Sequence, residues 1–162
     1  AIAAKNLKGV PCCNFIGSGG AGHFVKMIHN GIEYAEMQLL AEVISLALSD
    51  PSNSIKTIQK MLQDWQKTTS ESYLLDITAS LLGFRESGRP FIDSIKDEAS
   101  NKGTGAWATA EGAELGSANS LMASALHARF TSSNKKQRSL LSKTFKSKTT
   151  STSLSLSALK VS

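Results

Sequence analysis

The sequence has only two cysteines and no long apolar run, and each of these features excludes a class of protein. Its two cysteines, Cys12 and Cys13, are adjacent, which is a poor arrangement for a structural disulfide and matches no common spacing of metal ligands. We therefore expect no disulfide framework and no metal site. No stretch predicts a membrane-spanning helix, and no secretory signal pattern is visible. The composition favours a cytoplasmic protein with no membrane partner.

Acidic residues are missing from the last part of the chain. None follows Glu114, so a chain with a formal net charge of +5 is mildly acidic first and strongly basic last. Such a basic segment suggests nucleic acid as a partner. Beyond Thr131, however, Phe145 is the one aromatic residue among the cations, and binding to unpaired bases usually needs several stacking aromatics. We therefore expect no nucleic-acid partner and keep a basic nucleic-acid-binding module only as a minor alternative.

The hydrophobic pattern predicts a mainly α-helical fold. A chain of 162 residues with 41% hydrophobic content can form one domain with a core. Apolar residues recur at helical spacing, with Ser54 as an N-cap, a turn over 85–90 and a short helical segment over 91–99. The longer helices are expected over about 22–49, 55–65, 73–84, from about Trp107 onward, and over 118–130. These helices should form a multi-helical, bundle-like domain built around the longest one.

The ends of the chain do not fit this helical pattern. Residues 10–16 form a short apolar run that predicts a single strand, which we interpret as a remnant strand of a missing Rossmann domain. The expected organisation is therefore the end of a nucleotide-binding domain over 1–16 and a helical catalytic domain over 17–131. A basic Ser/Thr-rich linker over 132–153 follows, weakly ordered apart from a short helix around Leu140 and Leu141. Residues 154–162, whose alternating Leu and Ser also fit a strand, are interpreted as the start of a truncated helix.

A glycine cluster over 17–22 fits the pattern G-x-G-x-x-G of dinucleotide-binding loops. That function requires a second strand ending in an acidic residue about 20 residues further on. A continuous helical pattern occupies that place instead. We therefore interpret these glycines as allowing close approach of a ligand to the backbone rather than as a nucleotide fingerprint.

The helix that follows this glycine cluster carries a polar stripe. At about 100° per residue, Lys26, Asn30 and Glu33 fall within about 60° of one another, and His29 and Tyr34 flank them. Lys26 and Glu33 are too far apart to be an ordinary i,i+4 pair. A base, an acid and hydrogen-bonding groups held on one helix predict a proton-transfer site. The residues expected to face the core from the opposite side are Phe24, Ile28, Ala35 and Leu39.

A second informative stretch is Asn101-Lys102-Gly103-Thr104-Gly105. A glycine-flanked turn that leads into a helix can present backbone amides, a cation and a hydroxyl to an anion. An ordinary interhelical turn is the alternative interpretation from these residues alone.

These stretches resemble a known enzyme family. Gly17-x-x-Gly20-x-Gly22-x-x-x-Lys26-x-x-x-Asn30 resembles the signature of the β-hydroxyacid dehydrogenase superfamily. The fuller run over 20–34, Gly-Ala-Gly-His-Phe-Val-Lys-Met-Ile-His-Asn-Gly-Ile-Glu-Tyr, resembles the 6-phosphogluconate dehydrogenase family, as does Lys102-Gly103-Thr104-Gly105-x-Trp107. Ala128-Arg129 resembles the end of that family's Phe-Ala-Arg segment, with His127 in place of the aromatic residue. The match places the chain in the first half of the family's C-terminal helical domain.

The resemblance implies oxidation of 6-phosphogluconate with NADP, followed by loss of carbon dioxide to give ribulose 5-phosphate. By analogy, Lys26 is the general base, a role for which a lysine must be partly neutral, and Glu33 is the acid that protonates C1. Asn30 contacts both the substrate and the nicotinamide. The other substrate-binding residues implied are His29, Tyr34, Lys102, Thr104 and Arg129, of which all but His29 hold the phosphate.

The family also implies a homodimer in the intact enzyme, and we expect the 162-residue chain to be inactive alone. The nearest alternative is another β-hydroxyacid dehydrogenase acting on a small unphosphorylated hydroxy acid. Such an enzyme would share Lys26 and Asn30 but would have no use for Lys102, Thr104 and Arg129 together.

Overall fold

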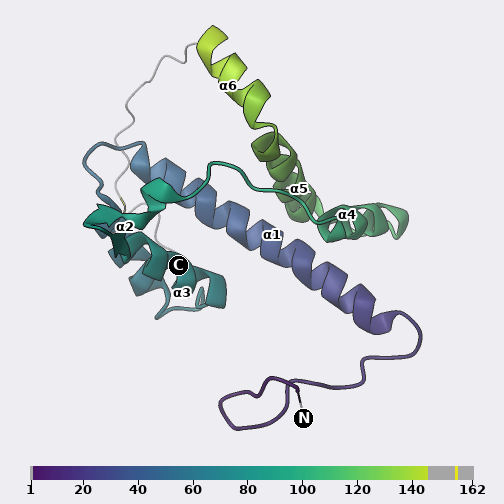
Figure 1. Ribbon diagram of the computed structural model, residues 1–162. Coiled ribbons are helices and arrows are strands. Elements are labelled where there is room, and N and C mark those ends of the chain that lie inside the picture. Colours follow the sequence, from purple (N-terminus) through teal and green to yellow (C-terminus); the bar gives the residue numbers. More distant parts are fainter. Residues whose placement is uncertain (1, 146–155, 157–162) are drawn as a thin grey trace.

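The computed structural model describes residues 2–145 and 156 and is mainly helical (Figure 1). In chain order, the elements are α1 (Ala21–Leu48), α2 (Ile55–Trp65), α3 (Tyr73–Gly83), β1 (Arg85–Glu86), β2 (Arg89–Pro90), the 3₁₀ helix η1 (Phe91–Ser94), α4 (Thr104–Glu114), α5 (Ser120–Ser133) and α6 (Lys135–Thr144). The long central helix and the helices on either side of it match the predicted fold class. No described helix combines the length and apolar character that a membrane crossing needs.

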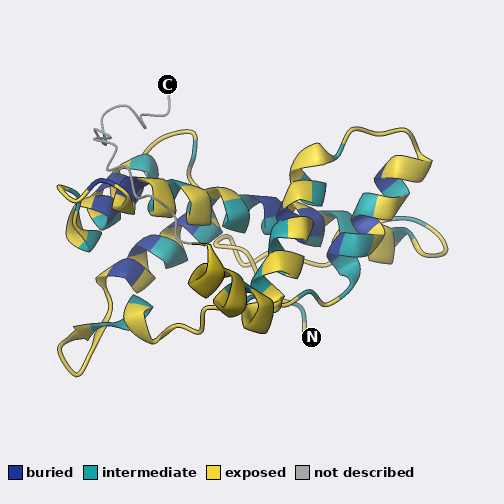
Figure 2. Ribbon diagram, turned by 90° about the horizontal axis from the view of Figure 1, so that it is seen from above, coloured by how far each residue is buried: buried dark blue, intermediate teal, exposed yellow. Residues whose placement is uncertain are grey.

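Helix α1 is the axis of the molecule, and different helices pack against its two halves. Helices α4 and α5 pack along its first half, whereas α2 and α3 lie near its last turns (Figure 1). Buried residues accordingly gather in two places along α1 (Figure 2). The larger cluster consists of Ala47, Ile58, Met61, Leu62, Leu75, Ala79 and Leu82.

The start of α2 shows how the sequence sets a helix boundary. The side chain of Ser54 accepts a hydrogen bond from the backbone N–H of Thr57, and the hydroxyl of Thr57 accepts one from the N–H of Ser54. This reciprocal capping box satisfies two N–H groups that would otherwise lack a partner. The predicted N-cap at Ser54 is confirmed.

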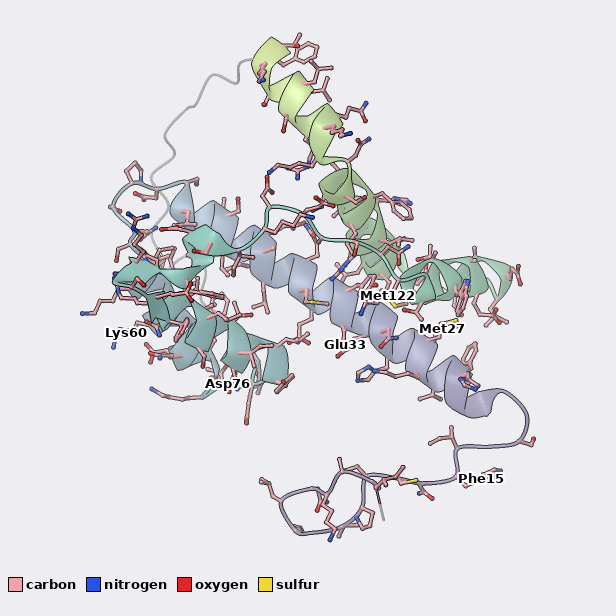
Figure 3. All side chains as sticks on the ribbon, in the orientation of Figure 1. Phe15, Met27, Glu33, Lys60, Asp76 and Met122 are labelled. Carbon is pink, nitrogen blue, oxygen red and sulfur yellow. The ribbon has the colours of Figure 1, made fainter. Side chains whose placement is uncertain are left out.

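Small residues allow α1 to approach α4 and α5 closely. A Cβ added at Gly31 would lie 2.8 Å from Sδ of Met122 and 3.2 Å from Cβ of Ala108. Figure 3 shows Met122 of α5 lying against α1. A side chain at Gly31 would have to displace Met122 and crowd Ala108, so this glycine favours the close packing of α1 against α4 and α5.

The face of α1 that we predicted to be buried is only partly so. Ala35 is 4% exposed and Ile28 half-buried, but Phe24 is 42% and Leu39 45% exposed. Both residues lie on the same face of α1 as Gly31 and Ala35, but the helices that pack there leave them at hollows, Phe24 beside Trp107 and Leu39 beside Trp65. The prediction that Phe24 and Leu39 face a core is therefore wrong for the described residues.

The strand predicted over 10–16 does not form. The N-terminal segment instead holds an isolated bridge between Lys5 and Pro11, and it extends away from the helices (Figure 1). Phe15, which lies where this segment turns toward α1 in Figure 3, is 80% exposed. A strand needs a neighbouring strand to satisfy its backbone groups, and the described residues supply none to this segment.

Two further predictions differ from the structure in detail. The turn over 85–90 is a hairpin whose β1 and β2 are joined by Ser87 and Gly88, both at positive φ. The helical segment predicted over 91–99 is only η1, because Ile95 is already extended.

The region interpreted as a weakly ordered linker begins with helix. Helix α5 continues through Ser133, and α6 occupies 135–144, a longer helix than the short one expected around Leu140 and Leu141. Lys135 and Arg138 of α6 form ion pairs with Asp97, and Arg138 also donates to the carbonyls of Asp97 and Ser132. The rest of that range, and the helix start expected over 154–162 apart from Leu156, lie outside the described residues.

Candidate active site

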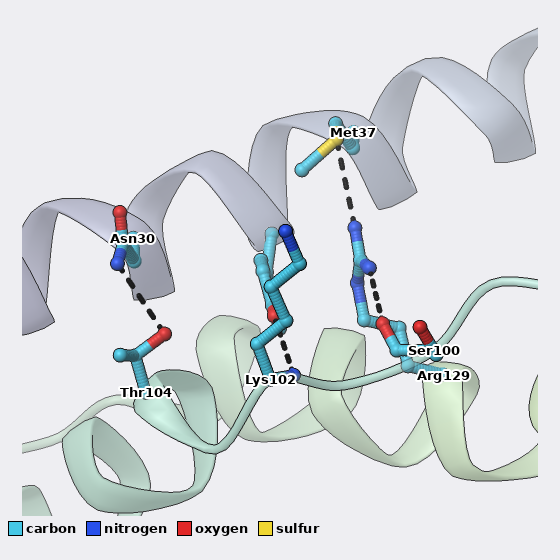
Figure 4. A pocket seen from close by; sticks show the side chains of 7 residues that line it. Asn30, Met37, Ser100, Lys102, Thr104 and Arg129 are labelled. Carbon is cyan, nitrogen blue, oxygen red and sulfur yellow. Dashed lines mark hydrogen bonds between the residues drawn. The ribbon is translucent and has the colours of Figure 1, made fainter.

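A hollow of about 440 Å³ lies between α1, the loop before α4, the start of α4, and α5 (Figure 4). It collects side chains that are up to a hundred positions apart in the chain. The lining residues are Asn30, Tyr34, Met37, Ser100, Lys102, Thr104 and Arg129. Five of these seven were predicted as site residues from the sequence, so the fold brings both predicted stretches and Arg129 to one place.

The start of α4 faces this hollow. Asn30 donates a hydrogen bond from Nδ2 to Oγ1 of Thr104, at 3.3 Å, which connects α1 to the first residue of α4 (Figure 4). Gly103 precedes the helix at a φ of 97°, a conformation that favours glycine, and α4 has no side-chain cap. The first N–H groups of an uncapped helix attract anions. This end of the hollow is therefore suited to a negatively charged group.

Tyr34 joins the loop to α1. Its hydroxyl accepts a hydrogen bond from the backbone N–H of Lys102 at 3.5 Å, and its ring lies beneath the guanidinium of Arg129, whose Cζ is 3.8 Å from the ring centre. A Cβ at Gly105 would come within 2.9 Å of the ring. Glycine at this position is what lets α4 approach Tyr34 so closely.

Arg129 is held on three sides. Besides stacking on Tyr34, it donates from Nη1 to the carbonyl of Ser100 at 2.8 Å, and Nη2 contacts the sulfur of Met37 at 3.5 Å (Figure 4). A guanidinium has five N–H donors in one plane, so these contacts orient the group and leave further donors for a ligand. Arg129 and Lys102 thus bring two cations to the lining of this hollow, with Lys102 between Thr104 and Arg129 in Figure 4.

Lys26, His29 and Glu33 form a separate polar cluster on α1. Nζ of Lys26 lies 3.1 Å from Nδ1 of His29 and 3.7 Å from Oε2 of Glu33, and Nδ1 of His29 is 3.2 Å from the same oxygen. The His29 ring nitrogen therefore either accepts from Lys26 or donates to Glu33, depending on which nitrogen carries the proton. An amine and a carboxylate two turns apart thus meet around one imidazole. Their side chains are 63% and 37% exposed.

A second hollow, of about 340 Å³, adjoins the first on the N-terminal side of Asn30. Asn30 and Thr104 line both hollows, and Lys26 lines the second. The other residues around it are His23, Phe24, Met27, Trp107 and Glu111. His29 and Glu33 line neither of these two hollows, but both contact Lys26, which lines the second. The structure therefore brings five predicted residues into one pocket and leaves Lys26, His29 and Glu33, the residues predicted to transfer protons, beside it.

Sequence reasoning missed Met37, Ser100 and Trp107. Met37 is two turns after Asn30 and therefore on the same face of α1, a signal that was available. Trp107 belongs to the quoted Lys102 motif and lies one turn after Thr104 on α4. Ser100 contributes its backbone carbonyl to Arg129, and no side-chain pattern could have indicated that.

The described residues hold no group of three or more His, Cys, Asp or Glu side chains suited to a metal ion. Cys12 and Cys13 are free and exposed.

Comparisons with known proteins identify relatives of this chain. The family model described as "6-phosphogluconate dehydrogenase, C-terminal domain" matches residues 22–160. Decarboxylating 6-phosphogluconate dehydrogenase of Haemophilus influenzae is 42% identical over 139 residues, which are 85% of this chain and 29% of that protein. The Ovis aries enzyme is 43% identical over 146 residues, 90% of this chain and 30% of that protein.

A solved structure shares the fold. The chain superimposes on Plasmodium falciparum 6-phosphogluconate dehydrogenase with a TM-score of 0.80 and 33% identity, covering 89% of this chain and 31% of that one. That enzyme has been solved without ligand, with its cofactor NADP+ and with its substrate 6-phosphogluconate. The chain thus spans about 30% of the length of the relatives it matches.

Proposed function

Because this chain belongs to the 6-phosphogluconate dehydrogenase family, we propose that it supplies the substrate-binding part of an enzyme that oxidises and decarboxylates 6-phosphogluconate. The product of that reaction is ribulose 5-phosphate, and the reaction is a step of the pentose phosphate pathway. The observation that carries the proposal is the hollow in which Tyr34, Lys102, Thr104 and Arg129 converge beside Asn30.

The cationic end of the hollow would hold the substrate's phosphate. Lys102 and Arg129 supply charge, Thr104 supplies a hydroxyl, and the uncapped start of α4 supplies backbone N–H groups. Tyr34 orients Arg129 and the Lys102 backbone. An unphosphorylated hydroxy acid would leave these groups without a partner, so a sugar phosphate is the better fit.

Proton transfer would fall to Lys26 and Glu33. In this proposal Lys26 takes the proton of the 3-hydroxyl while C3 is oxidised, and it returns a proton to the ketone oxygen as the carboxylate is lost. Glu33 then protonates C1. His29, within hydrogen-bonding distance of both, orients the substrate hydroxyls and keeps the two groups together.

NADP, when bound, would accept the hydride from C3. Of the described residues, Asn30 is the one we expect to contact the nicotinamide, because it lines both hollows and can face substrate on one side and a ring on the other. The rest of the cofactor site is assigned to a nucleotide-binding domain that would precede residue 17. We further propose a homodimer for the intact enzyme and a cytoplasmic location.

A titration tests the substrate proposal. The 162-residue chain is titrated with 6-phosphogluconate and, separately, with gluconate, and the amide shifts of Asn30, Lys102 and Thr104 are followed by NMR. We expect 6-phosphogluconate to bind with the lower Kd and to move these amides. Equal Kd values for the two compounds, or shifts confined to other helices, would contradict the proposal. We also expect no NADPH production by this chain alone.

A further inference from the structure

The loop that carries Lys102 is held at successive positions by residues from other helices. The backbone N–H of Ala99 donates to Oγ of Ser132 at 2.9 Å, and the carbonyl of Ser100 accepts from Arg129 at 2.8 Å. The N–H of Lys102 then donates to Tyr34. In Figure 1 this loop passes beside the junction of α5 and α6. The position of Lys102 therefore depends on contacts made outside the loop itself.

Arg138 of α6 makes the outermost of these contacts. Its Nη2 donates to the carbonyl of Asp97 at 2.8 Å and to the carbonyl of Ser132 at 3.0 Å, and its Nε donates to the same Ser132 carbonyl at 3.3 Å. Its Nη1 lies 3.2 Å from Oδ2 of Asp97. One guanidinium therefore bridges the backbone of the loop and the end of α5. It also fixes Ser132, whose hydroxyl accepts from Ala99.

We propose that Arg138 is a positioning residue for the phosphate end of the candidate site, acting through Asp97 and Ser132 on the loop that carries Lys102. This inference rests on the proposed function. Arg138 lies outside the quoted family motifs, in a region whose composition predicted a weakly ordered linker. A planar guanidinium is required, because an ammonium group is a compact donor and does not bridge two carbonyls and a carboxylate in the same way.

Lys135 also pairs with Asp97 but does not have the same role. Among the described residues, its Nζ contacts the Asp97 carboxylate alone, whereas Arg138 also binds the carbonyls of Asp97 and Ser132. The Asp97 side chain is 66% exposed, so a pair between exposed side chains is expected to contribute little. The backbone bonds of Arg138 should therefore account for most of the effect on the loop.

The first test measures the loop without any ligand. Amide hydrogen exchange of Ala99 and Lys102 is compared in the 162-residue chain and in Arg138→Ala, Arg138→Lys and Lys136→Ala, the last removing an exposed cation of the same helix as a control. We expect Arg138→Ala to speed exchange at both amides about tenfold, the effect of losing charge-assisted hydrogen bonds. Arg138→Lys should resemble it, and amides of α2 should be unchanged. Equal exchange in Arg138→Ala and Lys136→Ala would overturn the proposal.

The second test measures the ligand. In Arg138→Ala, we expect the Kd for 6-phosphogluconate to rise roughly threefold to tenfold while the Kd for gluconate stays the same. An equal rise for both compounds, or no rise, would overturn a positioning role at the phosphate end. If the unmodified chain does not prefer 6-phosphogluconate, the proposed function fails, and the exchange experiment still decides whether Arg138 holds the loop.

Discussion

The guanidinium of Arg129 lies over the ring of Tyr34, with Cζ 3.8 Å from the ring centre, although α1 and α5 are far apart in sequence. The contact places a cation and a phenol at the same end of the hollow, and it uses the hydrophobic face of the guanidinium while its edge still points at polar groups. In the proposed function, binding of the substrate's phosphate depends on this stack.

Replacing Arg129 with Lys tests that stack. The lysine keeps the charge but loses the planar fork, the hydrogen bond to Ser100 and most of the contact with Tyr34. We expect the Kd for 6-phosphogluconate to rise about tenfold, the effect of losing one charge-assisted hydrogen bond. Calorimetric titration measures it, and Arg89→Lys in the exposed hairpin is the matched control. An unchanged Kd for 6-phosphogluconate would show that Arg129 does not bind the phosphate.

Lys26 is tested by its chemistry rather than by binding. In a full-length enzyme that contains this chain, Lys26→Met should lower kcat by about a hundredfold or more, as expected for loss of a general base, while the Kd for 6-phosphogluconate changes little. Lys60→Met on α2, whose side chain is exposed, is the control. Near-normal turnover of the Lys26 variant would refute the assigned role.

Gly105 and Gly22 make a matched pair for the packing of the site. Each is the second residue of its helix, but a Cβ at Gly105 would lie 2.9 Å from the Tyr34 ring, whereas one at Gly22 would meet nothing within 4 Å. We expect Gly105→Ala to lower the free energy of unfolding by about 1–3 kcal/mol through overpacking. Gly22→Ala should leave it equal or raise it by about 0.5–1 kcal/mol. Urea unfolding distinguishes the two, and equal effects would show that Gly105 is not closely packed.

The capping box of α2 should be visible in stability. Ser54→Ala removes the acceptor of the Thr57 N–H and is expected to cost about 1 kcal/mol of unfolding free energy. Ser45→Ala, at an exposed position inside α1, should cost nothing because alanine is the better helix former. If the two variants have the same free energy of unfolding, the cap makes no measurable contribution to stability.

Asp97 gives the region a weak dependence on acidity. Hydrogen bonds from Lys135 and then Arg138 hold the pKa of Asp97 below its usual value of 3.8. Because the folded-state pKa is the lower one, the contribution of this carboxylate is complete above about pH 4 and is lost as the pH falls through the folded pKa. The free energy of unfolding should therefore fall more steeply from about pH 5 downward for the unmodified chain than for Asp97→Asn. Asp93→Asn is the control, and high salt should reduce the difference.

The sequence by itself determined most of the helices and the positions of the motifs along them. Periodic apolar residues and the cap at Ser54 act between positions three or four apart, so a helix and its start can be predicted locally. The spacing of Lys26, Asn30 and Glu33 likewise follows from helical geometry alone. The same reasoning failed at residues 10–16, where a strand needs partners that a local pattern does not contain.

Only the tertiary structure decided how distant segments meet. Three contacts join residues that no local sequence pattern relates to one another. They are the stack of Arg129 on Tyr34, the hydrogen bond from Arg129 to the Ser100 carbonyl, and the hydrogen bond from Arg138 to Asp97. The exposure of Leu39 has the same origin, because burial depends on which helix packs against a face and not on the face alone. Local periodicity fixes the face that a side chain occupies, and long-range packing fixes what that face touches.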